Sequence, residues 1–180
     1  FYYWIIAISY KLLGISAFSS RLPSAICAIL LVLFTWYVGK KVLGNISGFL
    51  SAVILATSVE YIMLGRRAAT DITLTLFFSS SLYSICLGYF IKDFRVKIFW
   101  TVLSGVFAGL AILTKGPIGV VLPFVILGGF LLARKQFDIK HIKVFFIILI
   151  TALIVSIPWY IAVHVATGGE FTNVFFFKHN

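Results

Sequence analysis

Two short polar stretches hold most of the residues in this chain that could do chemistry. Residues 66–71 (RRAATD) place two arginines just before Asp71, and residues 114–117 (TKGP) place Lys115 just before a Gly-Pro pair. Fixed cations with a carboxylate among them are typical of a site for an anionic head group, because charged hydrogen bonds to phosphate are strong and directional. We therefore interpret these two stretches as the candidate binding site.

Asp71 is the hardest of these residues to explain as an ordinary surface charge. It stands at the start of a long apolar segment, where a carboxylate is costly unless it is paired, bound to a metal ion or used in function. If residue 67 already belongs to the following helix, Arg67 and Asp71 share a helix face at i, i+4 spacing. For Arg66 an alternative interpretation remains, in which it forms a salt bridge at the membrane interface that only holds a hairpin together. Asp71 is the candidate catalytic residue, able to hold a metal ion or bind a sugar hydroxyl.

Lys115 lies between two apolar segments. The nearest acidic residues along the chain are Asp93 and Asp138, so its ammonium group must find a partner elsewhere in the structure. The Gly-Pro pair after it ends one helix and begins the next, since proline is tolerated in a first helical turn. A lysine beside a helix start suits phosphate. The alternative to phosphate binding is a structural one, in which Lys115 lies in a tight turn and its side chain extends to place the ammonium group in water.

The last part of the chain adds further polar residues. His164 follows residues 157–160 (IPWY), and Lys178 and His179 come close to the final residue. We include His164 and Lys178 as candidate phosphate-binding residues. The spacing of the two histidines matches no metal motif, so no metal ligand is assigned and a divalent metal ion stays an open option.

The elements that must position these residues are membrane helices. The 180 residues are 62% hydrophobic and only 11% charged, with a mean hydropathy of +1.12, which is far from the composition of a soluble domain. About 20 apolar residues cross a bilayer, and in lipid such a run must be helical. The sequence therefore predicts an all-α polytopic bundle with an interfacial helix at 1–13 and spans at 22–39, 45–64, 72–91, 98–114, 116–133 and 144–163.

The positions of the charges predict the orientation of the bundle. If the spans alternate, lysines and arginines are more numerous in the loops at 40–41, 92–97 and 134–143, which the positive-inside rule places in the cytoplasm. Residues 66–71, Lys115 and the last residues then lie on the other face. The formal net charge of +10 fits membrane lipid head groups as partners rather than nucleic acid, because the cations are scattered over loops.

The order of these motifs resembles that of the bacterial polyprenyl-phosphate-dependent glycosyltransferases of the C-type superfamily (GT-C), the relatives of aminoarabinose transferases and protein O-mannosyltransferases. Each matching stretch is short, but together they cover nearly the whole chain. The stretches are residues 2–4 (YYW), 20–25 (SRLPSA), 65–71 (GRRAATD), 108–117 (AGLAILTKGP), 157–160 (IPWY) and 178–180 (KHN).

This resemblance implies an integral enzyme of the bacterial inner membrane. Such an enzyme transfers a sugar from a polyprenyl-phosphate carrier to a lipid, glycan or protein acceptor on the periplasmic side. Lys115, Arg66 and Arg67 would face the carrier phosphate, and Asp71 matches the acidic residue of the family's second outer loop. The family places its general base in a first outer loop that would precede Phe1. Residues 1–180 are therefore expected to form part of one transmembrane domain, an internal fragment that is inactive by itself.

Two other classes of function stay open from the residues alone. A transporter or lipid flippase would show charges or broken helices near the bilayer midplane, whereas the predicted spans contain only Glu60 as a charged residue and Pro123 as a mid-span proline. A non-catalytic scaffold would be favoured if Arg66, Arg67, Asp71 and Lys115 pointed in different directions.

Overall fold

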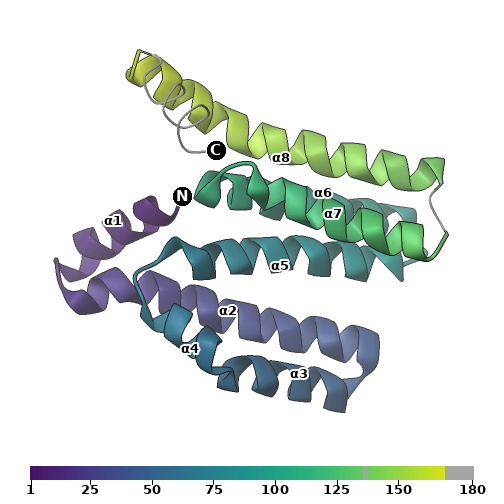
Figure 1. Ribbon diagram of the computed structural model, residues 1–180, viewed down its shortest axis with the longest axis horizontal. Helices are drawn as coiled ribbons and strands as arrows, with labels where there is room; N and C mark the ends of the chain where they lie inside the picture. The colour runs from purple at the N-terminus through teal and green to yellow at the C-terminus, as the bar shows by residue number, and fades with distance from the viewer. Residues whose placement is uncertain (136–137, 169–180) are drawn as a thin grey trace.

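The computed structural model describes residues 1–135 and 138–168, and every regular element in this part of the chain is an α-helix. The helices run back and forth as a flattened bundle, with α8 at one edge and α3 at the other (Figure 1). Their bounds are α1 Tyr2–Leu13, α2 Ala17–Leu43, α3 Asn45–Thr57, α4 Val59–Arg66, α5 Thr70–Tyr89, α6 Phe94–Lys115, α7 Ile118–Ala133 and α8 Ile139–Ala166. The predicted all-α transmembrane bundle is confirmed.

The predicted spans correspond to helices of unequal length. In the part of the chain that the structure describes, α2, α5, α6 and α8 are long and apolar enough to cross a membrane. The predicted span at 45–64 is instead a bent pair, α3 and α4, which meet at an angle of 62° across Ser58 and make a fifth span if counted together. The predicted span at 116–133 is the 16-residue α7, about 24 Å long at the usual helical rise.

Small residues let the central helices pack closely, as is usual between membrane helices. On the α5–α6 contact the hydroxyl groups of Ser81 and Ser104 lie 3.0 Å apart and are buried. On the α6–α8 contact, a Cβ added to Gly105 or Gly109 would lie 2.6 or 2.7 Å from a side-chain atom of α8. α5 and α6 therefore form one tight hairpin, and α8 packs on its far side.

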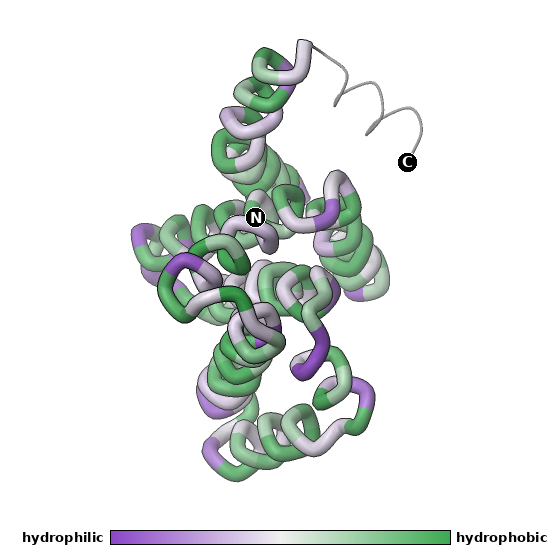
Figure 2. Tube along the Cα trace, turned by 90° about the vertical axis from the view of Figure 1, so that its left-hand side faces the viewer, coloured by the Kyte–Doolittle hydropathy of each residue, from purple (hydrophilic) through white to green (hydrophobic). Residues whose placement is uncertain are grey.

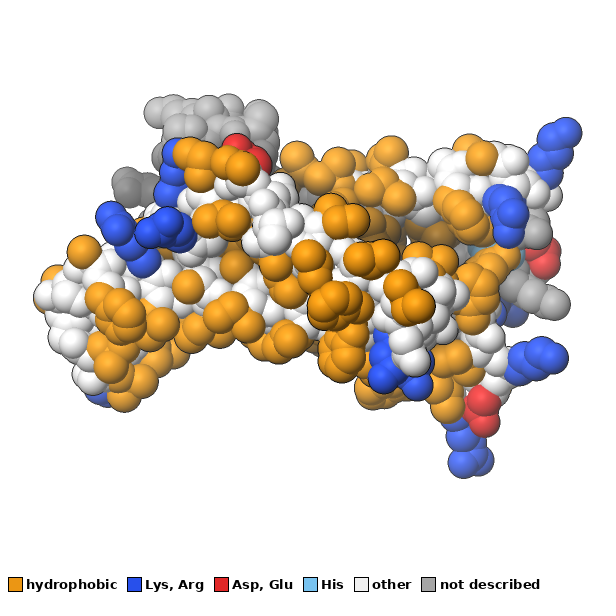
Figure 3. Space-filling model, turned by 90° about the horizontal axis from the view of Figure 1, so that it is seen from below, with side chains coloured by type: hydrophobic (Ala, Val, Ile, Leu, Met, Phe, Trp, Pro, Cys, Tyr) orange, Lys and Arg blue, Asp and Glu red, His pale blue; other side chains and the backbone are white. Residues whose placement is uncertain are grey.

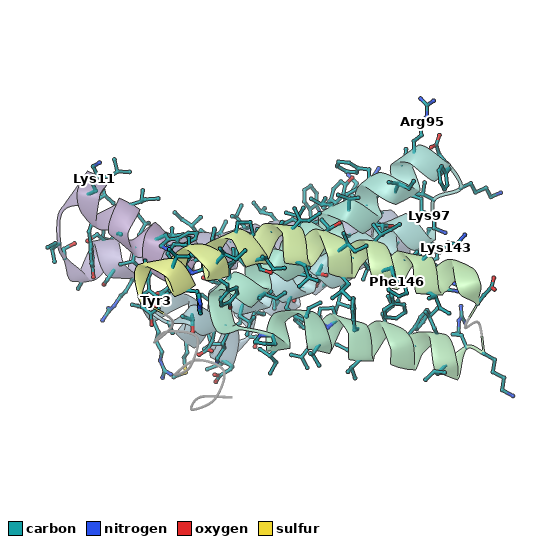
Figure 4. All side chains as sticks on the ribbon, turned by 90° about the horizontal axis from the view of Figure 1, so that it is seen from above. Tyr3, Lys11, Arg95, Lys97, Lys143 and Phe146 are labelled. Atoms are coloured by element: carbon teal, nitrogen blue, oxygen red, sulfur yellow. The ribbon has the colours of Figure 1, made fainter. Side chains whose placement is uncertain are left out.

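Polar residues concentrate at the two ends of the bundle. Viewed along the helices, the tubes are mainly hydrophobic (Figure 2), and lysines and arginines gather at both ends of the space-filling surface (Figure 3). Arg95, Lys97 and Lys143 lie at one end, and Lys11 lies at the other (Figure 4). This end-to-end separation is the arrangement that the alternating spans predicted.

The predicted interfacial segment is a separate 12-residue helix, α1, at the same end as Lys11. The hydroxyl groups of Tyr2 and Ser24 lie 3.0 Å apart, which ties α1 to α2. Burial raises the pKa of the Tyr2 phenol above its usual value, so this hydroxyl keeps its proton. At the other face of α1, the rings of Trp4 and Trp159 are in edge-to-face contact, with their centroids 4.3 Å apart.

Candidate functional site

Asp71 and Lys115 meet at one end of the α5–α6 hairpin. Asp71 lies in the first turn of α5 and Lys115 in the last turn of α6. Because the two antiparallel helices have similar lengths and are joined by a short turn, the beginning of α5 lies beside the end of α6. The Lys115 Nζ atom donates a hydrogen bond of 2.6 Å to Asp71 Oδ1. The ammonium group thus finds the distant partner that its place in the sequence required.

The helices themselves favour both charges of this pair. A carboxylate at a helix N-terminus and an ammonium at a helix C-terminus each interact favourably with the helix dipole. The two side chains are 46% and 52% exposed, respectively. An ion pair this accessible is weak, worth roughly 0–1 kcal/mol. Lys115 is therefore held in place by Asp71 yet is free to exchange part of that contact for an incoming anion.

The turn after Lys115 is tight, and glycines occupy its two most constrained positions. Gly116 has a φ of 83° and donates its N–H to the Ile112 carbonyl at 2.7 Å. A Cβ added to Gly119 would lie 2.5 Å from the Ala111 carbonyl carbon. The N–H groups of Gly119 and Val120 already bond to carbonyl groups of the same turn. These two N–H groups at the start of α7 are therefore already bonded, so the predicted phosphate role of Lys115 depends on its ammonium group.

Arg66 and Arg67 close the neighbouring α4–α5 corner. Arg66 is the last residue of α4, whereas Arg67 has an extended backbone and α5 begins only at Thr70. The condition for an i, i+4 pair of Arg67 and Asp71, that residue 67 already belongs to the following helix, is therefore not met. Arg66 instead lines a hollow of about 480 Å³ between α2 and α4, together with Arg21.

His164 lies at the same end, near the close of α8. Tyr160 donates a hydrogen bond of 3.2 Å to the Ile112 carbonyl, one turn before Lys115. His164 follows Tyr160 by four residues, which places it on the same face of α8 and one turn farther out. Lys178, with Glu170 and His179, lies outside the described residues.

The candidate site, as far as the structure describes it, does not contain a set of side chains that could bind a divalent metal ion. Among residues 1–135 and 138–168, no three His, Cys, Asp or Glu side chains lie together. Asp71 is the one carboxylate of the candidate site in that range, and Lys115 occupies it. These residues therefore do not provide a site for a metal ion.

The structure thus joins two of the four side chains on which the sequence argument depended. Lys115 and Asp71 are in contact, but no ion pair within the described ranges links either of them to Arg66 or Arg67. Sequence reasoning missed Arg21 as a neighbour of Arg66 and gave Tyr160 no contact with another helix. The SRLPSA stretch was a usable signal for Arg21, whereas nothing in the sequence indicated the Tyr160 contact.

Comparison with known proteins assigns most of the chain, residues 1–161, to one family. The sequence profile of the dolichyl-phosphate-mannose-protein mannosyltransferases matches residues 1–161. A protein of Aquifex aeolicus (strain VF5) is 31% identical over 96% of this chain and 34% of its own length. The undecaprenyl phosphate-alpha-4-amino-4-deoxy-L-arabinose arabinosyl transferase of Pectobacterium atrosepticum is 27% identical over 98% of this chain and 32% of its own.

A solved structure shows the same arrangement of helices. The crystal structure of ArnT from Cupriavidus metallidurans, bound to undecaprenyl phosphate, superposes with a TM-score of 0.91 at 23% sequence identity. The match covers 98% of this chain and 33% of ArnT. The chain thus spans about a third of the length of the relatives that it matches.

Proposed function

Because this chain belongs to the dolichyl-phosphate-mannose-protein mannosyltransferase family, we propose that it contributes to a membrane-embedded glycosyltransferase. The enzyme takes a sugar from a polyprenyl-phosphate carrier and transfers it to a lipid, glycan or protein acceptor. Residues 1–180 form part of one transmembrane domain. The Pectobacterium relative is named for such a transfer from undecaprenyl phosphate, which supports this choice of donor.

The contact between Lys115 and Asp71 is the observation that carries the proposal. In the transfer, the bond between the anomeric carbon and the carrier phosphate oxygen breaks, and a bond from the acceptor oxygen to that carbon forms. The acceptor proton passes to a base, and negative charge develops on the departing phosphate. A preorganised ammonium group stabilises that charge most effectively where water is partly excluded. The end of α6 places the half-exposed ammonium group of Lys115 beside Asp71 at the end of the bundle, where a bound lipid head group would displace part of the water around it.

Each predicted residue takes a defined place in this scheme. Lys115, Arg66 and Arg67 face the carrier phosphate, and His164 and Lys178 are further candidate phosphate-binding residues. Asp71 orients Lys115 and binds a hydroxyl group of the sugar as the phosphate draws the ammonium group away. The aspartate is thus the catalytic carboxylate of this part of the protein.

The location follows from the same reasoning. Within residues 1–135 and 138–168, four helices, or five spans with the bent α3–α4 pair, are long and apolar enough to cross a membrane, so the protein is an integral membrane protein. We place it in the bacterial inner membrane, with Lys115 and Asp71 on the periplasmic side, because lysines and arginines are more numerous in the loops at the opposite end. Membrane lipids surround the bundle.

One feature that the transporter alternative called for is present, because the α3–α4 span is broken at Ser58. The break is accompanied by a contact between helices, in which the Tyr61 hydroxyl donates to the Ala28 carbonyl at 2.7 Å. Glu60, two residues after the break, is exposed. The candidate ion pair instead lies at the end of the bundle, which favours a site for a lipid head group over a translocation pathway.

The proposal is tested with the full-length protein in proteoliposomes. Undecaprenyl-phosphate-linked aminoarabinose and mannose would each be supplied with a lipid A or peptide acceptor, and product would be measured by mass spectrometry. We expect transfer of one of these sugars, and a fall of about 10²–10³ in kcat for Lys115→Met, as for loss of one preorganised charge-stabilising group. Lys97→Met, at the opposite end of the bundle, is the control. Wild-type protein without transfer of either sugar, or with equal turnover in both variants, would overturn the proposal.

A further inference from the structure

A cleft of about 330 Å³ opens between α5 and α7. Its walls lie within residues 82–90 at the end of α5 and residues 126–134 at the end of α7, and Val42 near the end of α2 also lines it. Because the contact between Lys115 and Asp71 is at the beginning of α5, this cleft lies at the opposite end of the bundle. We call it the α5–α7 cleft.

The walls of the cleft are mainly apolar, with an arginine at its mouth. Among the described residues that line the cleft, Arg134 alone is charged, and it is the C-cap residue of α7. Its guanidinium carbon lies 5.6 Å from the centroid of the Phe130 ring. The Phe130 and Tyr89 rings are in edge-to-face contact, with centroids 6.2 Å apart, which joins α7 to α5. The cation–π contact keeps Arg134 at the mouth without using its N–H donors.

The described residues do not neutralise the positive charge at this mouth. Arg134, Lys41 and Lys92 are exposed near the ends of α7, α2 and α5, and none has an ion-pair partner within residues 1–135 and 138–168. The acid next to Lys92, Asp93, instead accepts hydrogen bonds from backbone N–H groups in the first turn of α6. A guanidinium group binds phosphate with two parallel hydrogen bonds. The mouth is therefore complementary to the phosphate of an anionic lipid.

The depth of the cleft indicates which kind of lipid fits. The lining positions on α7 run from Ile126 to Arg134, which is about 12 Å at 1.5 Å per residue. Those on α5, from Leu82 to Phe90, span the same number of residues. One leaflet of the hydrocarbon core is about 15 Å thick, half of roughly 30 Å. The cleft thus ends within a single leaflet, where the acyl chains of a phospholipid lie, and does not match a chain that crosses the midplane.

We propose that the α5–α7 cleft binds an anionic glycerophospholipid of the cytoplasmic leaflet, with one acyl chain between the two helices and the phosphate on Arg134. The positive-inside rule places this end of the bundle in the cytoplasm, and anionic lipids give that leaflet its negative surface potential. The bound lipid fixes the end of α7 against α5. The assignment depends on the orientation of the bundle and not on sugar transfer, because the cleft lies apart from Lys115 and Asp71.

The test measures lipid binding by the purified full-length protein in detergent. Phosphatidylglycerol, which is anionic, and phosphatidylcholine, which has no net charge, would be titrated with identical acyl chains, and bound lipid would be counted by native mass spectrometry. Arg134→Gln removes a charged hydrogen bond to the phosphate and the net attraction for the anionic lipid, so we expect about tenfold weaker binding of phosphatidylglycerol. Arg95→Gln is the matched control, since Arg95 is exposed at the same end (Figure 4) and does not line the cleft.

A second pair of variants tests the apolar part of the cleft. Ile126→Trp fills space between α5 and α7, so we expect about tenfold weaker binding of phosphatidylglycerol through loss of contacts with the acyl chain. Val125→Trp is the matched control, because Val125 is the preceding residue of the same helix, is 64% exposed and does not line the cleft.

Equal affinities of the wild type, Arg134→Gln and Ile126→Trp for phosphatidylglycerol would overturn the assignment. A loss for Arg95→Gln as large as that for Arg134→Gln would do the same, because it would indicate attraction by diffuse surface charge. Wild-type protein that binds no phosphatidylglycerol would show that another part of the full-length chain covers the cleft. Displacement of phosphatidylglycerol by undecaprenyl phosphate at lower concentration than by phosphatidylglycerol itself would also contradict the choice of a phospholipid.

Discussion

The ammonium group of Lys115 lies 2.6 Å from the carboxylate of Asp71, although the two residues are 44 positions apart in the chain. Each belongs to the terminal turn of its helix, and the α5–α6 hairpin brings these turns together. The pair is half exposed, so it is accessible to a ligand in a way that a buried ion pair is not. This contact makes Lys115 and Asp71 a unit, and the unit can be tested as one.

Catalytic coupling between the two residues is the first prediction. Because Asp71 orients Lys115 as well as binding the sugar, the loss in transfer rate for the double variant Asp71→Asn/Lys115→Met should be smaller than the product of the two single losses. Residues that act together are strongly non-additive in this way. The measurement is kcat for the wild type, both single variants and the double variant of the full-length protein. Losses that multiply would show that the two side chains act independently.

Close packing at the turn after Lys115 gives a second prediction. Gly119→Ala forces a methyl group against the backbone of Ala111 and should lower stability by about 1–3 kcal/mol, the usual cost of overpacking. Gly129→Ala, in the same helix, is the matched control because nothing lies within 4 Å of its added Cβ. Thermal unfolding in detergent compares the two variants. Alanine has the higher helix propensity, so Gly129→Ala should not lower the Tm. A Tm as low for this control as for Gly119→Ala would show that the contact with Ala111 is not responsible.

The buried pair of serines between α5 and α6 gives a third prediction. The hydroxyl groups of Ser81 and Ser104 are bonded to one another at 3.0 Å. In membrane proteins such interhelical bonds are worth about 0.6 kcal/mol on average. A double-mutant cycle of Ser81→Ala and Ser104→Ala, followed by unfolding in a mixed detergent, should return a coupling energy of about this size. A coupling energy of zero would mean that each hydroxyl finds another partner once the first is removed.

A fourth prediction concerns the bond that fastens α8 to α6. Tyr160→Phe removes the hydroxyl that donates to the Ile112 carbonyl at 3.2 Å, and should lower stability by about 1 kcal/mol. Because Ile112 lies one turn before Lys115, we also expect a higher KM for the lipid-linked donor. Tyr3→Phe, at a side chain that is 73% exposed, should change neither quantity. An unchanged KM in Tyr160→Phe would show that the bond between α8 and α6 does not affect binding of the donor.

Much of the fold could be predicted from apolar runs alone. Each predicted span is helical in the structure, because a backbone in lipid must satisfy its own hydrogen bonds. The break at Ser58 could not be predicted, since residues 45–64 form an apolar run without a proline. The bend accompanies a hydrogen bond from Tyr61 to the backbone of another helix, and a contact of this kind is invisible to a pattern read along one segment.

The candidate site divides in the same way. The sequence by itself determined which residues stand at the ends of the apolar runs, because charges are excluded from their middles, and it thereby indicated Lys115, Asp71, Arg66 and His164 together. Only the tertiary structure decided which of these charges meet. Lys115 pairs with Asp71, whereas Arg66 and Arg21 line a hollow between α2 and α4. The physical reason is that helices apolar on all sides carry no periodic signal for their rotation, so packing of small residues sets which faces, and which end charges, come together.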